Sequence, residues 1–463
     1  MLIITLITLP FLTAIGTFVF SVRRKWIEML AIGSGTLELV FAALIVFGGK
    51  GAVAGNMLAQ YLSPDGLGSW FLLVVASLGF IGLCYSVSFL RTEEERGEIG
   101  YGRVKQYYAL YQLFLLSMFV AALAQNMILL WIAVEATTLS TAFLISFYGK
   151  STSIEAAWKY IIINSLALVI GLLGVFLFVG ALKYPELLPV IKIAFVLVLL
   201  GFGTKAGLAP MHTWLPDAHS EAPAPVSALL SGALLNIALL GILRFKEVID
   251  TVIGPSFSST TLFFFGTTSI VVASVLILVQ KQYKRLLAYS SIEHIGIITF
   301  GFALGGIGSV AALLHALYHS LAKSMLFLAS GNIVLRYHTL EIAHVRGLLR
   351  TLPVTGTVFL GGLLAVAGVP PFGTFLTEFV IFTTAFTVHP VLTIIALFAL
   401  ALAFVGIVRH LSTMLFGAAE TDIVPESAGS VIPLLVTFAL LIVLGLYTPH
   451  LLNLLVQEAV FSL

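Results

Sequence analysis

Long apolar segments recur along almost the whole chain. Each holds about 20 mostly apolar residues, enough for a helix to cross the roughly 30 Å hydrocarbon layer of a bilayer. By this length rule the chain contains about fourteen membrane spans. They lie near 1–20, 27–47, 68–90, 107–123, 126–148, 158–181, 192–214, 224–243, 260–279, 286–304, 308–335, 352–387, 390–414 and 431–448.

Proline interrupts two of these spans. The seventh contains the stretch KAGLAPMHTWLP, with Pro210 and Pro216. The twelfth contains VAGVPPFGTFL, with Pro370 and Pro371. Proline removes a backbone donor and clashes with the preceding turn, so both helices are expected to break at membrane depth.

The two breaks predict an internal repeat. Broken helices at corresponding positions of two halves indicate inverted repeats. The two breaks are an odd number of spans apart, so the second unit is inverted in the membrane relative to the first. The predicted fold is an all-helical integral membrane protein of about fourteen helices, with two inverted five-helix repeats. The predicted units are N-terminal helices one to three (1–104), a first repeat of helices four to eight (105–247), a second repeat of helices nine to thirteen (258–415) and a C-terminal region with helix fourteen (416–463).

The composition agrees with a membrane protein. Hydrophobic residues make up 60% of the chain and charged residues 10%, a balance outside the range of soluble domains. The single cysteine, Cys84, excludes a disulfide framework and an all-cysteine iron–sulfur site. The sequence contains no basic tract suited to nucleic acid. No basic residue precedes the first apolar stretch, so we interpret it as a retained helix and not as a cleaved signal.

Arginine and lysine are concentrated in the odd-numbered loops, beginning with Arg23, Arg24 and Lys25. Because basic loops stay in the cytoplasm, this bias predicts cytoplasmic odd-numbered loops and places both termini on the other side of the membrane. The mixed-charge stretch 91–105 is then expected to be a solvated cytoplasmic surface.

Ionisable side chains inside the spans are the most informative positions. A charge at the bilayer centre costs at least about 2.5–3.5 kcal/mol on insertion scales, so each such residue is a functional candidate by default. The candidates are Glu135, Lys159, Lys205, Lys323 and Glu378, together with His212, His219, His294, His315, His319 and His410.

The eleventh span, LLHALYHSLAKSMLF, places His315, His319 and Lys323 four residues apart and therefore on one face of a helix. Histidine titrates near neutral pH and a desolvated lysine can be brought toward it, so a row of such groups is suited to carrying protons. The alternative is a set of hydrogen-bonded pins between helices. Haem is not expected, because axial histidines normally face one another from different helices.

Glu135 and Lys205 lie on different spans, and each needs an opposite charge or a water cavity. Two groups whose proton affinities depend on each other form a coupled titrating pair, whereas the alternative is a static salt bridge that locks two helices. Lys205 precedes the first break and Glu378 follows the second. Unwound backbone admits water and frees carbonyls, which favours a role in carrying protons.

Four longer stretches resemble one known family. The chain resembles the proton-antiporter-like membrane subunits of respiratory complex I, Mrp-type sodium/proton antiporters and group 4 nickel–iron hydrogenases in KAGLAPMHTWLPDAHSEAPAPVSALLSG, YKRLLAYSSIEHIGI, HSLAKSMLFLASGNI and AVAGVPPFGTFLTEFVIF. The resemblance covers roughly residues 105–415, and the wording SSIEH looks most like component F of hydrogenase-4.

The resemblance implies fourteen helices and a half-channel in each repeat. By motif, Glu135 corresponds to the family's glutamate of the fifth helix, and Lys205 to its partner lysine on the broken seventh helix. Lys323 matches a lysine that some members carry on the eleventh helix. Glu378 matches the ionisable group on the broken twelfth helix, where other members have lysine.

The resemblance also implies that His294 and His319 lie on a central hydrophilic axis. One departure from the family pattern is Asn236, where many members have lysine or histidine on the eighth helix. Asparagine cannot act as a charged relay, so the connection between the halves would pass through water, His294 or another residue. The chain is also expected to lack the long lateral helix that some members have at the C-terminus.

The preferred function is a proton-translocating subunit of a redox-driven membrane complex, with no cofactor, metal or catalytic centre of its own. The expected partners are other antiporter-like subunits, a peripheral redox arm, the lipid bilayer and protons, with Na⁺ as a further candidate ion. The expected location is the prokaryotic cytoplasmic (inner) membrane. Two alternatives stay open: a Na⁺/H⁺ antiporter or bicarbonate-uptake type subunit without redox input, and a scaffold whose charges only pin helices.

Overall fold

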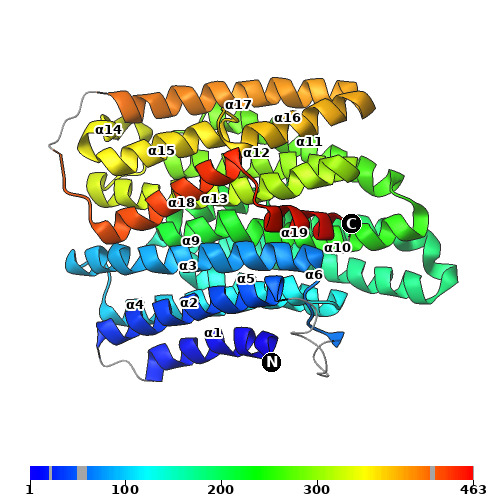
Figure 1. The fold of residues 1–463 in the computed structure, drawn as a ribbon, viewed down its shortest axis with the longest axis horizontal. Helices are drawn as coiled ribbons and strands as arrows, with labels where there is room; N and C mark the ends of the chain where they lie inside the picture. The colour runs from blue at the N-terminus through cyan, green and yellow to red at the C-terminus, as the bar shows by residue number, and fades with distance from the viewer. Residues whose placement is uncertain (20–22, 49–59, 418–422, 462–463) are drawn as a thin grey trace.

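The chain folds into a bundle of helices. A computed structural model describes residues 1–19, 23–48, 60–417 and 423–461. Within these ranges the structure contains helices and two isolated β-bridges, and no β-strand. Most helices run side by side along the long axis of the molecule, and both ends of the chain lie at the same end of the bundle (Figure 1). The predicted all-helical class is therefore confirmed.

The first half of the chain, in order, contains α1 (Leu2–Val19), α2 (Arg24–Phe47), α3 (Gly66–Glu95), α4 (Tyr101–Leu123), α5 (Met127–Ile145), α6 (Ser151–Lys183), η3 (Pro185–Val190), α7 (Ile191–Ala206), α8 (Trp214–Glu221), α9 (Ala224–Leu229), η4 (Leu230–Leu234) and α10 (Leu235–Ile253). The second half contains α11 (Ser256–Leu278), α12 (Tyr283–Leu304), α13 (Gly306–Tyr337), η5 (Ile342–His344), α14 (Leu348–Thr351), α15 (Pro353–Val366), α16 (Gly373–Val388), α17 (Pro390–Phe416), α18 (Ala428–Leu446) and α19 (His450–Phe461).

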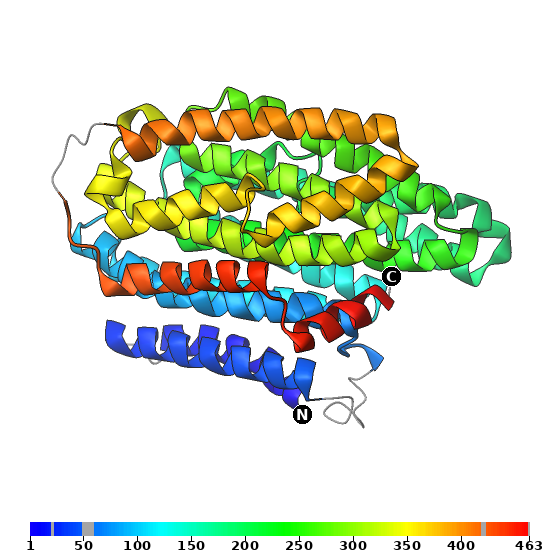
Figure 2. The same cartoon turned by 45° about the horizontal axis from the view of Figure 1, so that its top comes forward.

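The number of spans matches the prediction. In the described ranges, 13 helical segments are long and apolar enough to cross a membrane. The shorter apolar helices α15 and α16 follow one another along the bundle and together form one further crossing (Figure 2). This broken crossing is the predicted twelfth span. The inverted relation between residues 105–247 and 258–415 stays a prediction.

The first predicted break follows α7. This helix ends at Ala206, and Gly207 adopts a left-handed backbone with φ of 80°, which glycine reaches without strain. The indole Nε1 of Trp214 donates to the carbonyl oxygen of Thr204 at 2.8 Å. The Thr204 carbonyl also accepts from the backbone N–H of Gly207 at 3.0 Å, so the indole adds a second donor at the helix end.

The predicted end of the seventh span at residue 214 is wrong. A further helix, α8, begins at Trp214 and continues to Glu221. Pro216 lies in the first turn of α8, where backbone N–H groups have no helical acceptor. The proline therefore starts a helix here instead of ending one.

The second predicted break separates α15 from α16. The left-handed residue is Gly368, with φ of 63°. The hydroxyl of Thr374 donates to the carbonyl oxygen of Ala365 at 2.6 Å. Both breaks thus combine a left-handed glycine with a side chain that donates to a carbonyl of the helix's last turn.

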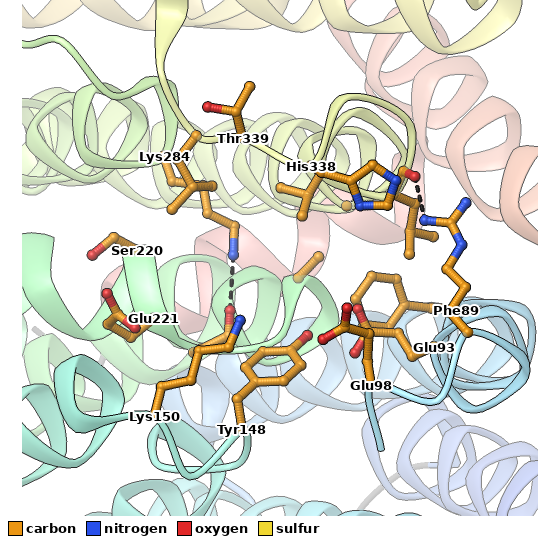
Figure 3. Close-up of a pocket in the computed structure, with 17 residues that line it drawn as sticks. Phe89, Glu93, Glu98, Tyr148, Lys150, Ser220, Glu221, Lys284, His338 and Thr339 are labelled. Carbon is orange, nitrogen blue, oxygen red and sulfur yellow. Dashed lines mark hydrogen bonds between the residues drawn. The ribbon is translucent and has the colours of Figure 1, made fainter.

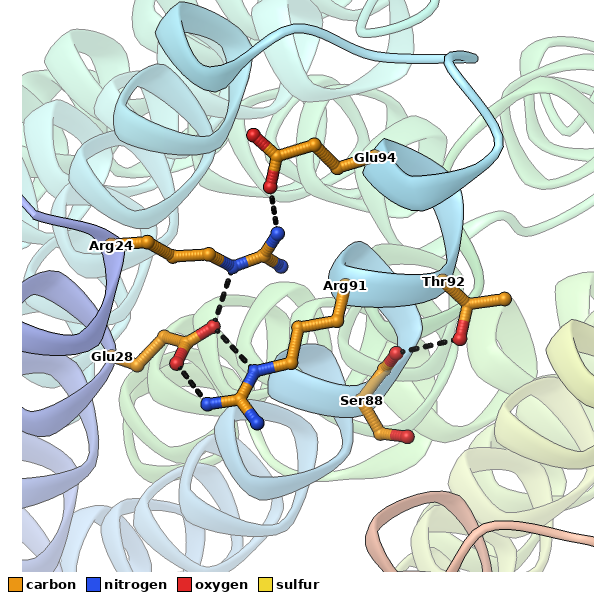
Figure 4. Close-up of polar contacts among 6 residues, drawn as sticks. All are labelled: Arg24, Glu28, Ser88, Arg91, Thr92 and Glu94. Carbon is orange, nitrogen blue, oxygen red and sulfur yellow. Dashed lines mark hydrogen bonds and ion pairs between the residues drawn. The ribbon is translucent and has the colours of Figure 1, made fainter.

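Ion pairs fasten α2 to the end of α3 (Figure 4). Arg24 Nε contacts Glu28 Oε1 at 2.7 Å, and the same guanidinium also contacts Glu94. Arg91 of α3 contacts the Glu28 carboxylate as well. The expectation that 91–105 is a solvated surface holds for most of its charges, since Arg91, Glu95, Arg96, Glu98 and Arg103 are exposed, whereas Glu93 is buried.

Close packing between α6 and α7 depends on two glycines. A Cβ atom added at Gly201 would lie 2.7 Å from the Cα atom of Gly171 and 2.8 Å from the carbonyl oxygen of Ala167. Small residues at such crossings let two backbones approach in a membrane, where apolar burial gives no driving force. α7 also carries Lys205, so this contact fixes the position of that lysine.

We expect Gly201→Val to destabilise the protein by about 1–3 kcal/mol, because the added carbons have no space at the α6–α7 crossing. The measurement is the fraction of monodisperse protein that remains after heating in detergent. Gly33→Ala is the control, since a Cβ atom there meets nothing within 4 Å. Equal heat resistance of the two variants would contradict the packing argument.

Candidate functional site

Lys205 stands at the end of α7, immediately before the first break. Its side chain is fully buried. Nζ donates to the hydroxyl of Thr138 on α5 at 2.9 Å and to the hydroxyl of Tyr160 on α6 at 2.5 Å. The ammonium also lies over the Tyr160 ring, 4.6 Å from its centroid. Neutral hydroxyls on two neighbouring helices therefore surround this lysine.

Glu135 is connected to this lysine through one of those hydroxyls. The Thr138 hydroxyl donates to Glu135 Oε2 at 3.5 Å, and the Ser165 hydroxyl donates to Oε1 at 2.8 Å. The structure brings the predicted partners to the same hydroxyl group. Among the ion pairs of the described residues, none joins Glu135 directly to Lys205. A static salt bridge is therefore not the arrangement that the structure has.

The ionisable side chains on α13 are not hydrogen-bonded to one another in sequence. His315, His319 and Lys323 are all buried on this helix, as predicted. His315 Nε2 is hydrogen-bonded to His294 Nδ1 of α12 at 2.9 Å. The His319 ring lies 5.4 Å from the His294 ring, measured between centroids. The connection between the α13 residues therefore passes through a histidine on the adjacent helix.

The second break is tied to this histidine pair. His294 Nε2 is hydrogen-bonded to the carbonyl oxygen of Val366, the last residue of α15, at 3.0 Å. His315 Nδ1 is hydrogen-bonded to the hydroxyl of Thr377 on α16 at 2.8 Å. The two imidazoles therefore link both halves of the broken helix to α12 and α13.

Glu378 completes this cluster. Possible ligand atoms of Glu378, His294 and His315 all lie within 4.8 Å of one another. These residue types could hold a divalent cation, but every ring nitrogen of the two histidines already has a hydrogen-bond partner in the protein. Gly368 lies against the Glu378 carboxylate, and a Cβ atom there would overlap it. The glycine thus leaves space for the carboxylate at the break.

The sequence interpretation missed Glu293. Lys323 Nζ donates to the carbonyl oxygen of Leu287 at 3.0 Å, and it interacts electrostatically with Glu293, which is buried on α12. The sequence did contain a signal for Glu293. The predicted repeat relates the fifth span, which carries Glu135, to the tenth span, which carries Glu293. Each half therefore contains a carboxylate and a lysine.

Asn236 lies between the two halves. Its Nδ2 donates to Ser320 Oγ on α13 at 2.7 Å and to the carbonyl oxygen of Gly232 at 3.0 Å. Ser320 Oγ donates to the same carbonyl at 2.6 Å. Gly232 belongs to the π-helical segment η4, and such segments are frequent at functional sites. Amide and hydroxyl groups therefore occupy the Asn236 position in the part of the bundle where the two halves meet.

Two other predicted histidines lie near the first break. His219 is fully buried on α8 and stacks on Phe327 of α13, with ring centroids 4.7 Å apart. His212 lies within the break, 6.2 Å from the ring of Tyr289. Through His219, the first break is in contact with the helix that carries Lys323.

Two predicted site residues lie apart from these clusters. Lys159 is exposed and forms ion pairs with Glu155 at 2.7 Å and Asp217 at 3.3 Å, so it is not one of the buried ionisable groups, and its role in proton translocation stays a prediction. His410 Nε2 is hydrogen-bonded to the carbonyl oxygen of Leu278 at 2.9 Å. Lys159 thus connects α6 with α8, and His410 connects α17 with α11, contacts that fit the alternative of structural pins.

Comparison with known proteins identifies the family. Residues 124–403 match the family described as "NADH:quinone oxidoreductase/Mrp antiporter, TM", and the chain belongs to it. A hydrogenase-4 component F homolog from Methylacidiphilum infernorum (isolate V4) is 36% identical over 410 residues, covering 84% of this chain and 86% of the relative. The resemblance to this family is therefore confirmed.

Solved structures agree with this membership. A chain of the membrane-bound sulfane sulfur reductase, described as an archaeal respiratory membrane complex, superposes with a TM-score of 0.89 at 25% identity, covering 99% of this chain and 97% of that one. A chain of respiratory complex I from Thermus thermophilus gives a TM-score of 0.80 at 25% identity, covering 98% and 99%. The protein is thus a multi-pass, antiporter-like membrane subunit of the respiratory type.

We expect Thr138→Val to slow proton exchange between Glu135 and Lys205, on a scale of about 100-fold, because valine keeps the shape but removes the connecting hydroxyl. The measurement is the number of protons moved per electron by the complete complex in membrane vesicles. Thr138→Ser keeps a hydroxyl and is expected to keep the ratio. Thr137→Val is the matched control, since the Thr137 hydroxyl donates to Val134 of its own helix. A normal ratio in Thr138→Val would remove this hydroxyl from the mechanism.

Proposed function

We propose that this chain translocates protons within a redox-driven multisubunit membrane complex. The proposal is based mainly on one observation. Lys205 is fully buried, and its ammonium group is hydrogen-bonded to the hydroxyls of Thr138 and Tyr160. A lysine that only pins helices is most stable against a carboxylate, because a buried charge needs a counter-charge. Hydroxyl groups both accept and donate protons, so this arrangement favours a lysine that changes its protonation state.

In the first half, Glu135 sets the proton affinity of Lys205 through the Thr138 hydroxyl. A change at a neighbouring subunit that moves the carboxylate toward or away from the lysine shifts that affinity, because an opposite charge favours the charged form. Lys205 then releases its proton toward the second half. The break after α7 provides the free backbone groups and space that such a release needs.

In the second half, Lys323 receives the proton and Glu293 has the role that Glu135 has in the first. The bonded pair of His294 and His315 carries the proton to Glu378 at the second break. Imidazole is suited to this step, because one ring nitrogen accepts while the other donates.

The proposed partners are further antiporter-like subunits and a peripheral redox arm, in the cytoplasmic membrane of a prokaryote. Membership of the family and the likeness to a chain of an archaeal respiratory membrane complex support this assignment. The energy source in this proposal lies in the partners, because the clusters around Lys205 and Lys323 contain acids, bases and hydroxyls, and the only cysteine of the chain is Cys84.

We expect Lys205→Met to lower the number of protons moved per electron while electron transfer continues, because methionine keeps the volume but cannot bind a proton. The measurement is made on the complete complex in sealed vesicles, with electron flow and proton uptake recorded together. Lys192→Met is the control, since Lys192 is exposed on the same helix.

Three outcomes discriminate between the candidate functions. A lower ratio in Lys205→Met with intact assembly supports proton translocation. A smaller amount of assembled complex, with a normal proton-to-electron ratio in the complex that remains, would support the scaffold. Sodium-dependent proton exchange in vesicles without an electron donor would support a secondary antiporter.

A further inference from the structure

A polar cavity of about 270 Å³ lies at the end of the bundle where the odd-numbered loops are found (Figure 3). Its walls come from the ends of α3 and α13, the turn between α5 and α6, the start of α12 and the junction of α8 with α9. The outer lining includes exposed Arg96, Glu98, Lys150 and His338, and the inner lining includes buried Glu93, Ser220 and Lys284. A cavity of this volume has room for several water molecules, since each occupies about 30 Å³.

Lys284 reaches the inner part of this cavity from the first turn of α12. Lys284 is only 5% exposed, and its Nζ donates to the carbonyl oxygen of Ala222 at 2.8 Å. An ammonium group has three donors, so this bond leaves capacity for water in the cavity. Glu93 faces the same cavity, and its Oε2 has no hydrogen-bond partner among the described residues. The cavity therefore holds a buried base and a buried acid that are not paired with each other.

His219 connects the surroundings of this cavity with the interior of the bundle. It directly precedes Ser220 of the cavity wall, and its ring stacks on α13 through Phe327. Neither ring nitrogen has a hydrogen-bond partner in the part of the chain that the structure describes. The ring interacts electrostatically with both Lys284 and Lys323. A buried imidazole without partners is unfavourable as a structural pin, because a pin needs bonds.

We propose that this cavity is a proton-uptake mouth that supplies Lys323 through Lys284 and His219, without passing through Lys205. The inference rests on the function proposed above and adds a second entrance to it. Lys284 is the uptake residue, and His219 is the relay between the two lysines. This entrance opens on the face that the basic loops assign to the cytoplasm.

The transfer moves one proton from water in the cavity to Lys323 and returns Lys284 and His219 to their starting charges. A proton carried by water in the cavity binds the neutral amine of Lys284, which becomes an ammonium. The ammonium gives that proton to the acceptor nitrogen of His219, and the ring releases the proton of its other nitrogen toward Lys323. Lys284 is then again an amine, the ring is again neutral, and Lys323 has become an ammonium. Rotation of the ring turns the nitrogen that now carries the proton toward Lys323, so the ring can accept the next proton from Lys284. The Glu93 carboxylate stabilises the positive charge at the mouth.

Two substitutions of Lys284 separate a relay from a structural role. Lys284→Met cannot bind a proton, and Lys284→Arg keeps the charge but cannot release its proton in a protein. We expect the complete complex with either variant to move fewer protons per electron in sealed vesicles. A lysine that only holds the carbonyl of Ala222 would be replaced well by arginine, so a normal ratio in Lys284→Arg overturns the proposal.

A second measurement does not depend on Lys284. In a Cys84→Ser background, Val334→Cys places a thiol on the cavity wall. We expect a charged methanethiosulfonate reagent to label it from the face of the basic loops only, and the bulky product to lower the proton ratio. Thr413→Cys is the matched control, since Thr413 is exposed near the end of α17, away from the cavity lining, and its labelling is expected to leave the ratio unchanged. Absence of labelling at Val334→Cys, or labelling without loss, overturns the proposal.

Lys205→Met measured in the same preparation tells the two proposals apart. If Lys205→Met loses protons per electron while Lys284→Arg and labelled Val334→Cys keep the normal ratio, the uptake mouth is wrong and the proposed function stands. If Lys205→Met keeps the normal ratio while Lys284→Arg and labelled Val334→Cys lower it, the role proposed for Lys205 fails and the uptake mouth stands, because the mouth supplies Lys323 without Lys205. If all three keep the normal ratio, both proposals fail.

Discussion

Buried polar groups in this bundle must find their partners inside the protein, because hydrocarbon offers none. An unsatisfied backbone group in lipid costs several kcal/mol, and a charge costs more. The two helix breaks concentrate this problem, since each leaves carbonyls without helical donors. At the first break a tryptophan indole reaches back to Thr204, and at the second His294 and Thr374 reach back to Val366 and Ala365. At the second break, one of the side chains that satisfies the backbone, His294, is itself titratable.

The partners of the charged groups are mostly neutral. Hydroxyls surround Lys205, a backbone carbonyl accepts from Lys323, and imidazoles bond to each other at 2.9 Å. Tight ion pairs are found instead at the ends of the bundle, as between Arg24 and Glu28 at 2.7 Å. Pairing with a full opposite charge fixes a protonation state, whereas a neutral partner allows it to change. The distribution of partners thus separates the residues that hold the fold from those suited to proton transfer.

Several parts of the site could be predicted from sequence because they depend on local rules. Pro210 and Pro371 signal the two breaks, and four-residue spacing puts His315, His319 and Lys323 on one helix face. Other parts depend on which helices are neighbours. That His294 bonds to His315 reflects how α12 packs on α13, and no spacing rule contains this information. The ion pair of Lys159 with Asp217 is a further example, because the position of Lys159 along α6 does not show that α8 lies beside it.

The sequence by itself determined that lipid surrounds the protein, that the fold is all-helical, how many times the chain crosses the membrane and where two of the helices break. Each of these follows from local backbone chemistry and from the hydrocarbon thickness. Only the tertiary structure decided that Glu135 meets Lys205 through Thr138, that Glu293 interacts with Lys323, and that His219 stacks on Phe327 without a bonded partner among the described residues. The physical reason is that proton transfer depends on distances between side chains of different helices, and close contacts such as Gly171 against Gly201 set those distances.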